Sequence, residues 1–451
     1  MKFAMKFRAL GALCITAGAI FWSYPVRAAL PIEHWVQASG AQVYLVHSPA
    51  IPMVDVQIEF DAGGRRNTAS QAGLAAVTAG AVSMGVRGVG VEPALDENAL
   101  GEAWADLGAS FGGSASNDRM TFSMRSLAYP DLLAKAAGLA ARQLAQPAYP
   151  EKFWLRDRPK MIASLKEAQT RPGTVAAQAF GKAVYGDHPY GYETTPDTLE
   201  RITVADMRAW HAASVRTCDA RVSIVGALDR QQADTLVSQM LSRLPASSCV
   251  AKPVVAEVQP LTASVEKHLA FASAQAHVLV GQPGFKRSDP DFFALTVGNH
   301  ILGGGGFTSR LTEEVREKRG LSYSVYSYFS PGSHAGAFTI GLQTRPDQAQ
   351  QALTVVRGVL ERFVAEGPTE AELQAAKDNL IGGFPLLIDS NRKLLGNVAN
   401  IAWNGLPLDY LDTWTQKVQK LNVGDIRAAF ARVLQPQRMV TVVLGAEKAP
   451  Q

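Results

Sequence analysis

The sequence lacks an excess of charge of one sign. It has 44 Lys and Arg residues against 40 Asp and Glu, and its first 28 residues hold four basic side chains and no acidic one. The rest of the chain therefore carries 40 charges of each sign. Such a balance gives no electrostatic footprint for nucleic acid. After residue 28 there is also no apolar stretch long enough to cross a bilayer, so we expect no membrane span there.

The N-terminus has the pattern of an export signal. Lys2, Lys6 and Arg8 precede an apolar run over residues 9–22, and Val26-Arg27-Ala28 fits a small-residue cleavage site. The run is short for a membrane anchor. We predict a cleavable signal peptide at residues 1–28 and a soluble periplasmic product.

Cysteine is scarce. Only Cys218 and Cys249 follow the signal peptide. In an oxidising compartment they could form a disulfide, which would add roughly 3–4 kcal/mol for a loop of this length. They could equally remain two buried thiols.

Motifs for metal binding or nucleophilic catalysis are missing. No two histidines stand at ligand spacing on one helix or strand, and no Gly-x-Ser-x-Gly elbow is present. We expect structural or surface roles for all eight histidines, which are His34, His47, His188, His211, His268, His277, His300 and His334.

An internal repeat is present. Residues 202–229 align without gaps to residues 421–448 at an offset of 219. Each copy reads as a capped helix that leads into an apolar strand ending at glycine, which indicates duplication. The identical pairs are Val204/Val423, Asp206/Asp425, Arg208/Arg427, Ala209/Ala428, Ala212/Ala431, Gly226/Gly445 and Ala227/Ala446.

The repeat predicts two homologous domains, at residues 29–247 and 260–451, joined by a proline-containing linker at 248–259. Alternating residues over 54–60 and 120–124 predict strands, and residues 131–145 and 230–244 have helical spacing. In the second domain we expect a charged helix at 308–319, strands at 321–329 and 335–343, and helices through 346–434. The predicted fold class is α+β, with each domain an antiparallel sheet that has helices packed on one face.

Three segments carry a resemblance to a known family. They are LGGGGFTSRLTEEVREKRGLSYSVYSY at 302–328, GDHPYG at 186–191 and AELQAAKDNLIGGFPLLIDS at 371–390. With the two-domain repeat, they resemble the insulinase/pitrilysin family of zinc metallopeptidases, in particular the short-chain branch similar to mitochondrial processing peptidases. The resemblance extends over nearly all of the chain after the signal peptide.

The family's inverted zinc motif, His-x-x-Glu-His, is absent. The resemblance places Ala76 and Gly80 at the two histidine positions, Ala79 at the general base, and Ser164 near the third ligand. Glu167 is close by, but one carboxylate does not hold a catalytic zinc. The chain is therefore expected to bind no metal or other cofactor.

The family's other half-site is retained. The resemblance implies that Arg316 and Tyr323 are the Arg and Tyr that reach a scissile carbonyl, where they would stabilise developing negative charge. Without the resemblance, Arg316 reads as part of a solvated charged face. The run Gly303–Gly306 lacks the context of a phosphate loop, and Phe111–Ala115 resembles an edge strand that pairs with extended polypeptide.

The residues and the resemblance together predict a non-catalytic subunit of a metalloendopeptidase complex. Its partner would be a homologous chain that carries the zinc, and its substrate a peptide or unfolded protein. A catalytically silent polypeptide-binding or scaffold protein is the alternative. An independent hydrolase with an unrecognised site is a third interpretation.

Overall fold

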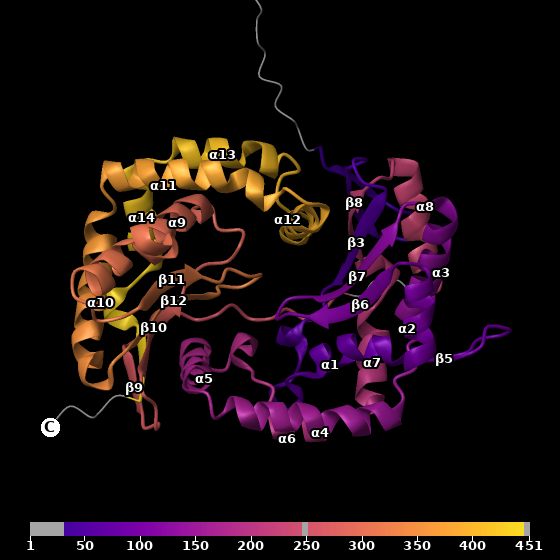
Figure 1. Ribbon diagram of the computed structural model, residues 1–451, viewed down its shortest axis with the longest axis horizontal. Helices are drawn as coiled ribbons and strands as arrows, with labels where there is room; N and C mark the ends of the chain where they lie inside the picture. Colours follow the sequence, from indigo (N-terminus) through magenta and orange to yellow (C-terminus); the bar gives the residue numbers. More distant parts are fainter. Residues whose placement is uncertain (1–30, 246–250, 446–451) are drawn as a thin grey trace, which may run out of the picture.

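The computed structural model describes residues 31–245 and 251–445, which form two halves, each built on one large β-sheet (Figure 1). The first sheet has the strand order β1-β2-β8-β3-β7-β6 and the second has the order β11-β12-β10-β13-β9. The first contains β1 (Glu33–Val36), β2 (Gln42–His47), β3 (Met53–Phe60), β6 (Ser110–Ala115), β7 (Met120–Leu127) and β8 (Arg221–Gly226). The second contains β9 (Val265–Leu269), β10 (Ala276–Pro283), β11 (Ser324–Phe329), β12 (Ala337–Thr344) and β13 (Val440–Leu444). The predicted signal peptide lies outside the described residues.

The two sheets share one topology. Without β1, the first sheet has the order β2-β8-β3-β7-β6, and the second sheet, counted from its opposite edge, has the order β9-β13-β10-β12-β11. In each, the first two strands are parallel and the following neighbours are antiparallel. A parallel pair needs a long crossover connection. Here the paired strands come from the beginning and the end of each half, which the sequence prediction of antiparallel sheets did not anticipate.

The predicted repeat is confirmed in detail. Helices α7 (Val204–Ser214) and α14 (Val423–Val433) begin and end at the same offset. Each has a capping box, with Thr203 and Asp206 in one copy and Asn422 and Asp425 in the other. The reciprocal hydrogen bonds satisfy free backbone donors at the helix start. The shared Asp206 and Asp425 are therefore explained by local helix chemistry.

Each half also contributes one helix to the other half. Helix α5 (Pro172–Tyr185) comes from the first half and packs on β10 and β13 of the second sheet (Figure 1). Helix α12 (Asn391–Asn404) comes from the second half and packs on β8, β3 and β2 of the first sheet. The two helices also stand 219 residues apart at both ends, so the exchange belongs to the repeat.

The exchange explains why the central strands are apolar on both faces. In β2, Val43 and Leu45 belong to the first half's own core, whereas Tyr44 and Val46 join the cluster that contains α12. Successive strand side chains point to opposite faces of a sheet. Each sheet is therefore covered by its own helices on one face and by the exchanged helix on the other.

Most remaining elements match the expected positions. The predicted helices at 131–145 and 230–244 are α3 (Pro130–Ala145) and α8 (Arg230–Leu241). The other helices of the first half are α1 (Leu74–Gly80), α2 (Glu97–Asp106), α4 (Glu151–Ala168) and α6 (Pro196–Arg201), and β4 (Gly85–Val86) pairs with β5 (Leu95–Asp96). Those of the second half are α9 (Phe292–Asn299), α10 (Ala349–Glu366), α11 (Glu370–Gly383) and α13 (Tyr410–Lys420).

The segment expected as a helix at 308–319 differs in form. Its core, Thr312–Glu317, is a π-helix, in which Lys318 N donates to Glu313 O at 2.9 Å. A second wide turn covers His300–Gly304. The glycine run starts inside this second turn and permits close packing, because a Cβ added at Gly303 would lie 2.5 Å from Ser327 Oγ on β11. The run thus has a packing role in the fold.

The predicted linker is described only in part. Residues 251–261 run without helix or strand. Cys218 is disulfide-bonded, but Cys249 lies outside the described residues, so the pairing of these two cysteines stays a prediction. The limits of the two domains stay predictions as well.

Candidate functional site

The site begins at helix α1, where the zinc motif would stand. Ala76 and Gly80 are one helical turn apart and both are exposed, whereas Ala79 is fully buried. Residues four apart share one face of a helix. Ala79 packs toward the sheet, where its carbonyl oxygen would lie 2.4 Å from a Cβ added at Gly113 of β6.

Helix α4 forms the opposite wall of a pocket. The pocket has a volume of about 480 Å³ and is lined by Ala76 and Gly80 from α1 and by Ser164 from α4. The structure thus brings three of the four predicted positions together around one space. Its remaining wall is almost entirely apolar and includes Val77, Met84, Phe153, Trp154, Met161, Leu165, Leu199, Val204 and Met207.

Sequence reasoning did not find this apolar wall. A signal was available in α4, because Phe153, Asp157, Met161 and Leu165 recur every four residues and all line the pocket. Such a stripe marks one face of a helix. The pocket residues of α6 and α7 lie far from α1 in the sequence, so no local pattern predicts that they line the same pocket.

The polar groups at this pocket are held in states unsuited to activating water. The hydrogen bond from Arg156 lowers the pKa of Asp157, and Lys160 also pairs with this carboxylate at 3.2 Å. Burial raises the pKa of Tyr149 above its ordinary value. A general base works best with a pKa near the working pH. Asp157 is instead a paired, ionised carboxylate, so it is poorly suited to act as a general base.

A histidine lies behind the pocket. His211 packs edge-on against Tyr149 with the ring centroids 5.8 Å apart, and burial lowers its pKa to about 4. The imidazole is therefore neutral at physiological pH. It supports the pocket wall, in agreement with the structural role expected from the sequence.

The residues present do not fit a zinc ion. Alanine and glycine offer no ligand atom, and zinc sites use Cys, His and carboxylate donors. Within residues 31–245 and 251–445, no group of three or more His, Cys, Asp and Glu side chains has an arrangement that could hold a metal ion. Glu167 is paired with Arg171 at 3.1 Å on the exposed side of α4.

A smaller polar compartment adjoins the apolar pocket. It has a volume of about 150 Å³ and shares Gly73, Ala76 and Thr194 with the larger one. Asn67 lines it and is 6% exposed. The Oδ1 atom of Asn67 accepts a hydrogen bond from Ala75 N at 3.2 Å, and its Nδ2 atom has no partner.

The predicted Arg and Tyr pair lies in the second half. Arg316 is in the π-helical turn, and its guanidinium carbon lies 5.7 Å from the ring centroid of Tyr323 and 4.6 Å from that of Phe307. Tyr323 is 88% exposed and Phe307 71% exposed. Arg316 Nε also contacts Glu317 at 3.3 Å. The structure brings the pair together and leaves the phenol projecting into solvent.

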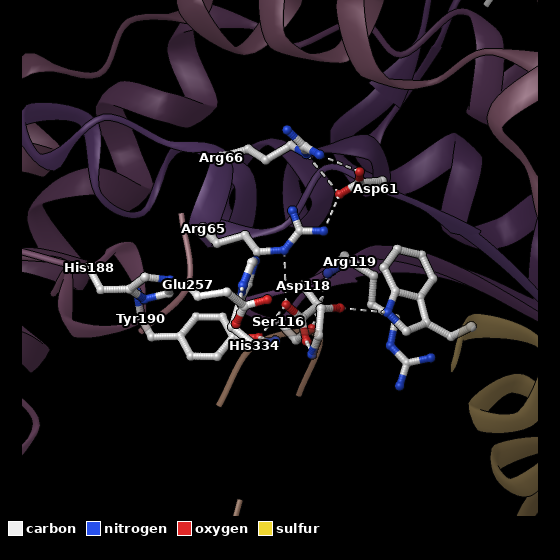
Figure 2. A network of polar contacts seen from close by, with 12 residues as sticks. Asp61, Arg65, Arg66, Ser116, Asp118, Arg119, His188, Tyr190, Glu257 and His334 are labelled. Carbon is white, nitrogen blue, oxygen red and sulfur yellow. Dashed lines mark hydrogen bonds and ion pairs between the residues drawn. The ribbon is translucent and has the colours of Figure 1, made fainter. Parts of the chain in front are cut away.

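A polar network joins the halves (Figure 2). Asp118 accepts hydrogen bonds from Arg65 Nε at 3.0 Å and Tyr190 Oη at 2.6 Å in the first half, and from Ser333 N at 2.9 Å in the second. His334 N donates to Tyr190 Oη at 3.1 Å. No local sequence pattern predicts these contacts, because their partners are far apart along the chain.

The same network accounts for the turn at residues 186–191. His188 lies with its ring centroid 5.2 Å from that of His334, and its Nε2 atom is 3.0 Å from Ala256 O. Burial lowers the pKa of His188. His334 Nδ1 lies 3.3 Å from Glu257 in the segment between the halves. Both histidines therefore belong to the junction between the halves.

Known proteins share this fold and part of this sequence. The crystal structure of a peptidase M16 inactive domain from Pseudomonas fluorescens matches with a TM-score of 0.87 and 33% identity, over 94% of this chain and 99% of that one. The chain belongs to the peptidase M16 family. The family profile described as the peptidase M16 inactive domain matches residues 201–380. The expected family and fold are confirmed.

Other relatives in the family are more distant. A non-peptidase homolog, YmxG of Helicobacter pylori, is 26% identical over 387 residues, which cover 83% of this chain and 85% of that one. An uncharacterized zinc protease of Streptomyces coelicolor is 27% identical over 301 residues, and the match spans 64% of each chain. The chain thus covers slightly less than two thirds of that relative's length. The periplasmic protease PqqL from Escherichia coli shares the fold, with a TM-score of 0.76 at 20% identity, and this chain covers 46% of it.

The matches agree with the chemistry of the site. The chain is similar to the inactive-domain profile and to a non-peptidase homolog, and its described residues contain no group of side chains that could hold a metal ion. The chain is a non-catalytic member of the M16 family. No helix among residues 31–245 and 251–445 has the length and apolar character of a membrane span.

Proposed function

We propose that this chain is the non-catalytic subunit of a two-chain zinc metallopeptidase of the periplasm. A homologous partner would hold the zinc, and this chain would bind extended peptide and supply Arg316 and Tyr323 to the partner's site. The observation that carries the proposal is an asymmetry within one chain. In the described residues the positions for the metal hold no ligand group, while a half-buried Arg316 and an exposed Tyr323 lie beside each other in the other half.

The chemistry of the pair supports this role. Attack on a peptide carbonyl builds negative charge on its oxygen, and a guanidinium with a phenol hydroxyl stabilises that charge over the neutral ground state. Both groups come from a short segment fixed by β11 and the π-helical turn. Because Tyr323 is 88% exposed, its hydroxyl is available to a second chain. Export is supported by the N-terminal signal pattern.

The test compares the chain alone, the zinc-bearing homolog alone, and the mixture, by zinc content and by cleavage of an unstructured peptide. We expect cleavage only by the mixture, with zinc only on the partner. Arg316→Ala and Tyr323→Phe should each lower kcat about 100-fold, because one such donor is worth on the order of 3 kcal/mol. Unchanged cleavage by both variants would refute the catalytic role.

Matched controls separate chemistry from folding. Arg319→Ala removes a neighbouring arginine that pairs with Glu314, and Tyr328→Phe removes a hydroxyl from the adjacent strand. Both should leave cleavage by the mixture within about twofold of the original. If these controls lose as much activity as Arg316→Ala, the effect is structural and the proposal fails.

A second function is favoured by the apolar pocket. A chain that only holds polypeptide would also need such a pocket and would make no use of Arg316 and Tyr323. That function predicts peptide binding by the isolated chain and no gain of cleavage in any mixture. The same measurements therefore decide between the two.

A further inference from the structure

The junction between the halves contains a histidine whose two ring nitrogens are both committed. His188 precedes the short helical turn Pro189–Gly191, and its Nδ1 atom lies 3.1 Å from Tyr190 N. Its Nε2 atom lies 3.0 Å from Ala256 O. A backbone N–H only donates and a carbonyl oxygen only accepts, so Nδ1 is the acceptor and Nε2 carries the proton. His188 is therefore neutral in this arrangement, with its tautomer fixed from both sides.

Protonation of His188 would remove the acceptor on which this turn depends. A charged imidazole has two donors and no acceptor. Its Nδ1–H would then face the N–H of Tyr190 at hydrogen-bond distance, and the cap of the turn would be lost. Because His188 is 8% exposed, water does not take the place of the lost acceptor without movement of the ring. The capped turn and a charged His188 are therefore incompatible in this geometry.

The charged groups that face His188 come from several segments around the turn (Figure 2). Arg65 lies in a short segment that packs on the turn, and the His334 ring lies 5.2 Å away between centroids. Glu257 is the facing anion, and it already pairs with Lys286 at 3.0 Å and lies 3.3 Å from His334 Nδ1. The other titratable groups around the ring are the phenols of Tyr185 and Tyr190 and the carboxylate of Asp118. Burial lowers the pKa of His188, and His334 and Arg65 act in the same direction.

The turn carries a contact that crosses between the halves. Tyr190 Oη donates to Asp118 at 2.6 Å and accepts from His334 N at 3.1 Å. His334 belongs to the loop between β11 and β12 of the second half, whereas Tyr190 and Asp118 belong to the first half. Ser333 N donates directly to Asp118 at 2.9 Å, without use of the tyrosine. Loss of the cap would therefore disturb the contact to His334 N and spare the contact to Ser333 N.

We propose that His188 is an acid-sensitive latch between the halves, which holds Tyr190 against His334 N while the imidazole is neutral and releases this contact when the imidazole is protonated. The exchanged helices α5 and α12 keep each half packed on the other, so the release is local to the junction. The latch uses neither Arg316 nor Tyr323 and is independent of the proposed function. Its stabilisation is complete above the ordinary histidine pKa of about 6.5 and declines as the pH falls from there through the lowered pKa of His188.

Hydrogen exchange resolved to single amides tests the latch in the full chain lacking its signal peptide. The released form binds one more proton than the latched form. Below about pH 6.5, the protection of Tyr190 N and His334 N should therefore fall by up to about tenfold per pH unit, after correction for intrinsic exchange. Ser333 N and the amides of α3 should keep their protection. Constant protection of Tyr190 N and His334 N, or a parallel loss at Ser333 N and in α3, overturns the proposal.

His188→Asn removes the titration and keeps the cap. Asparagine is favoured at the start of a helical turn, because its side-chain oxygen accepts from a backbone N–H of that turn. The variant should protect Tyr190 N and His334 N at neutral pH and keep that protection as the pH falls. His277→Asn is the matched control, because burial also lowers the pKa of His277 but this residue lies on β10. A pH response that persists in His188→Asn, or one that is lost in His277→Asn, overturns the proposal.

Tyr190→Phe separates the cap from the contact that it carries. Phenylalanine lacks the hydroxyl that accepts from His334 N, whereas the backbone N–H at this position and its acceptor on His188 remain. We expect the amide of residue 190 to keep its pH-dependent protection, and His334 N to exchange rapidly at every pH. If His334 N stays protected in this variant and still responds to pH, the response does not pass through Tyr190 and the proposal fails.

Discussion

Replacing Asp118 by alanine should destabilise the whole chain, because this carboxylate joins the halves. It lies with 14% of its side chain exposed and accepts hydrogen bonds from Arg65, Tyr190 and Ser333. Removing one partner of a buried ion pair costs about 3–5 kcal/mol. Arg65 keeps a second carboxylate, Asp61, at 2.6 Å, so its charge stays compensated. We therefore expect a loss of about 3–4 kcal/mol in the free energy of unfolding.

Asp118→Asn should be intermediate. The amide oxygen can still accept from Arg65 and Tyr190, but the amide nitrogen then faces Ser333 N, which is also a donor. A donor left without an acceptor costs about 1–3 kcal/mol, so about 2 kcal/mol should be lost. Asp106→Ala, an exposed acid on α2, is the control and should change stability by no more than about 0.5 kcal/mol.

The assay is equilibrium unfolding in urea, followed by circular dichroism and tryptophan fluorescence. If the halves unfold as one unit, the midpoint of Asp118→Ala should fall while both probes stay coincident. A loss below about 1 kcal/mol, or one equal to that of Asp106→Ala, would refute the reasoning that this carboxylate holds the halves together.

Three further outcomes are expected. The triple variant A76H, G80H and S164E installs the three missing ligands at the pocket. It should bind about one zinc per chain, measured by metal analysis after dialysis. If no zinc is bound, α1 and α4 are not positioned for coordination. Burial would raise the pKa of Glu372, but hydrogen bonds from Arg310 and Thr369 lower it to about 2. The stabilisation by this carboxylate is therefore complete above the unfolded pKa of about 4.3 and is lost as the pH falls through about 2. In urea unfolding, Glu372→Gln should differ from the original at pH 6 and converge with it only below about pH 2, and a constant difference would contradict the pairing. Phe180→Ala should cost about 3–5 kcal/mol in the same assay, because this α5 side chain is 5% exposed and packs on the sheet of the other half; an effect below about 1 kcal/mol would show that the exchanged helix is not part of that core.

The duplication was visible in the sequence because it rests on local chemistry. The caps at Thr203 and Asn422 and the apolar strands after them need only neighbouring residues, so their pattern survives in both copies. The exchange of α5 and α12 was not visible. An amphipathic helix shows that one face is buried, but its sequence does not state which sheet it covers.

The site was predictable in position but only partly in character. Ala76, Gly80 and Ser164 line one space, since residues four apart share a helix face and α4 lies opposite, but their roles as former metal positions stay a prediction. The pocket wall was missed because Leu199 and Met207 approach it from α6 and α7 through tertiary packing. The charged pattern near Arg316 predicted an ordinary helix, and nothing local in it marked the extra residue per turn of a π-helix.

The exchanged helices also limit how such a chain can act. Separating the halves would uncover the faces that α5 and α12 bury and would break the contacts of Asp118 at the same time. Large packed interfaces of this kind resist hinge opening. A substrate that must be enclosed therefore cannot be enclosed by closure of these two halves on each other. The edge of β6, the apolar pocket and the exposed Tyr323 therefore keep their places relative to one another, and under the proposed function a second chain would have to complete the enclosure.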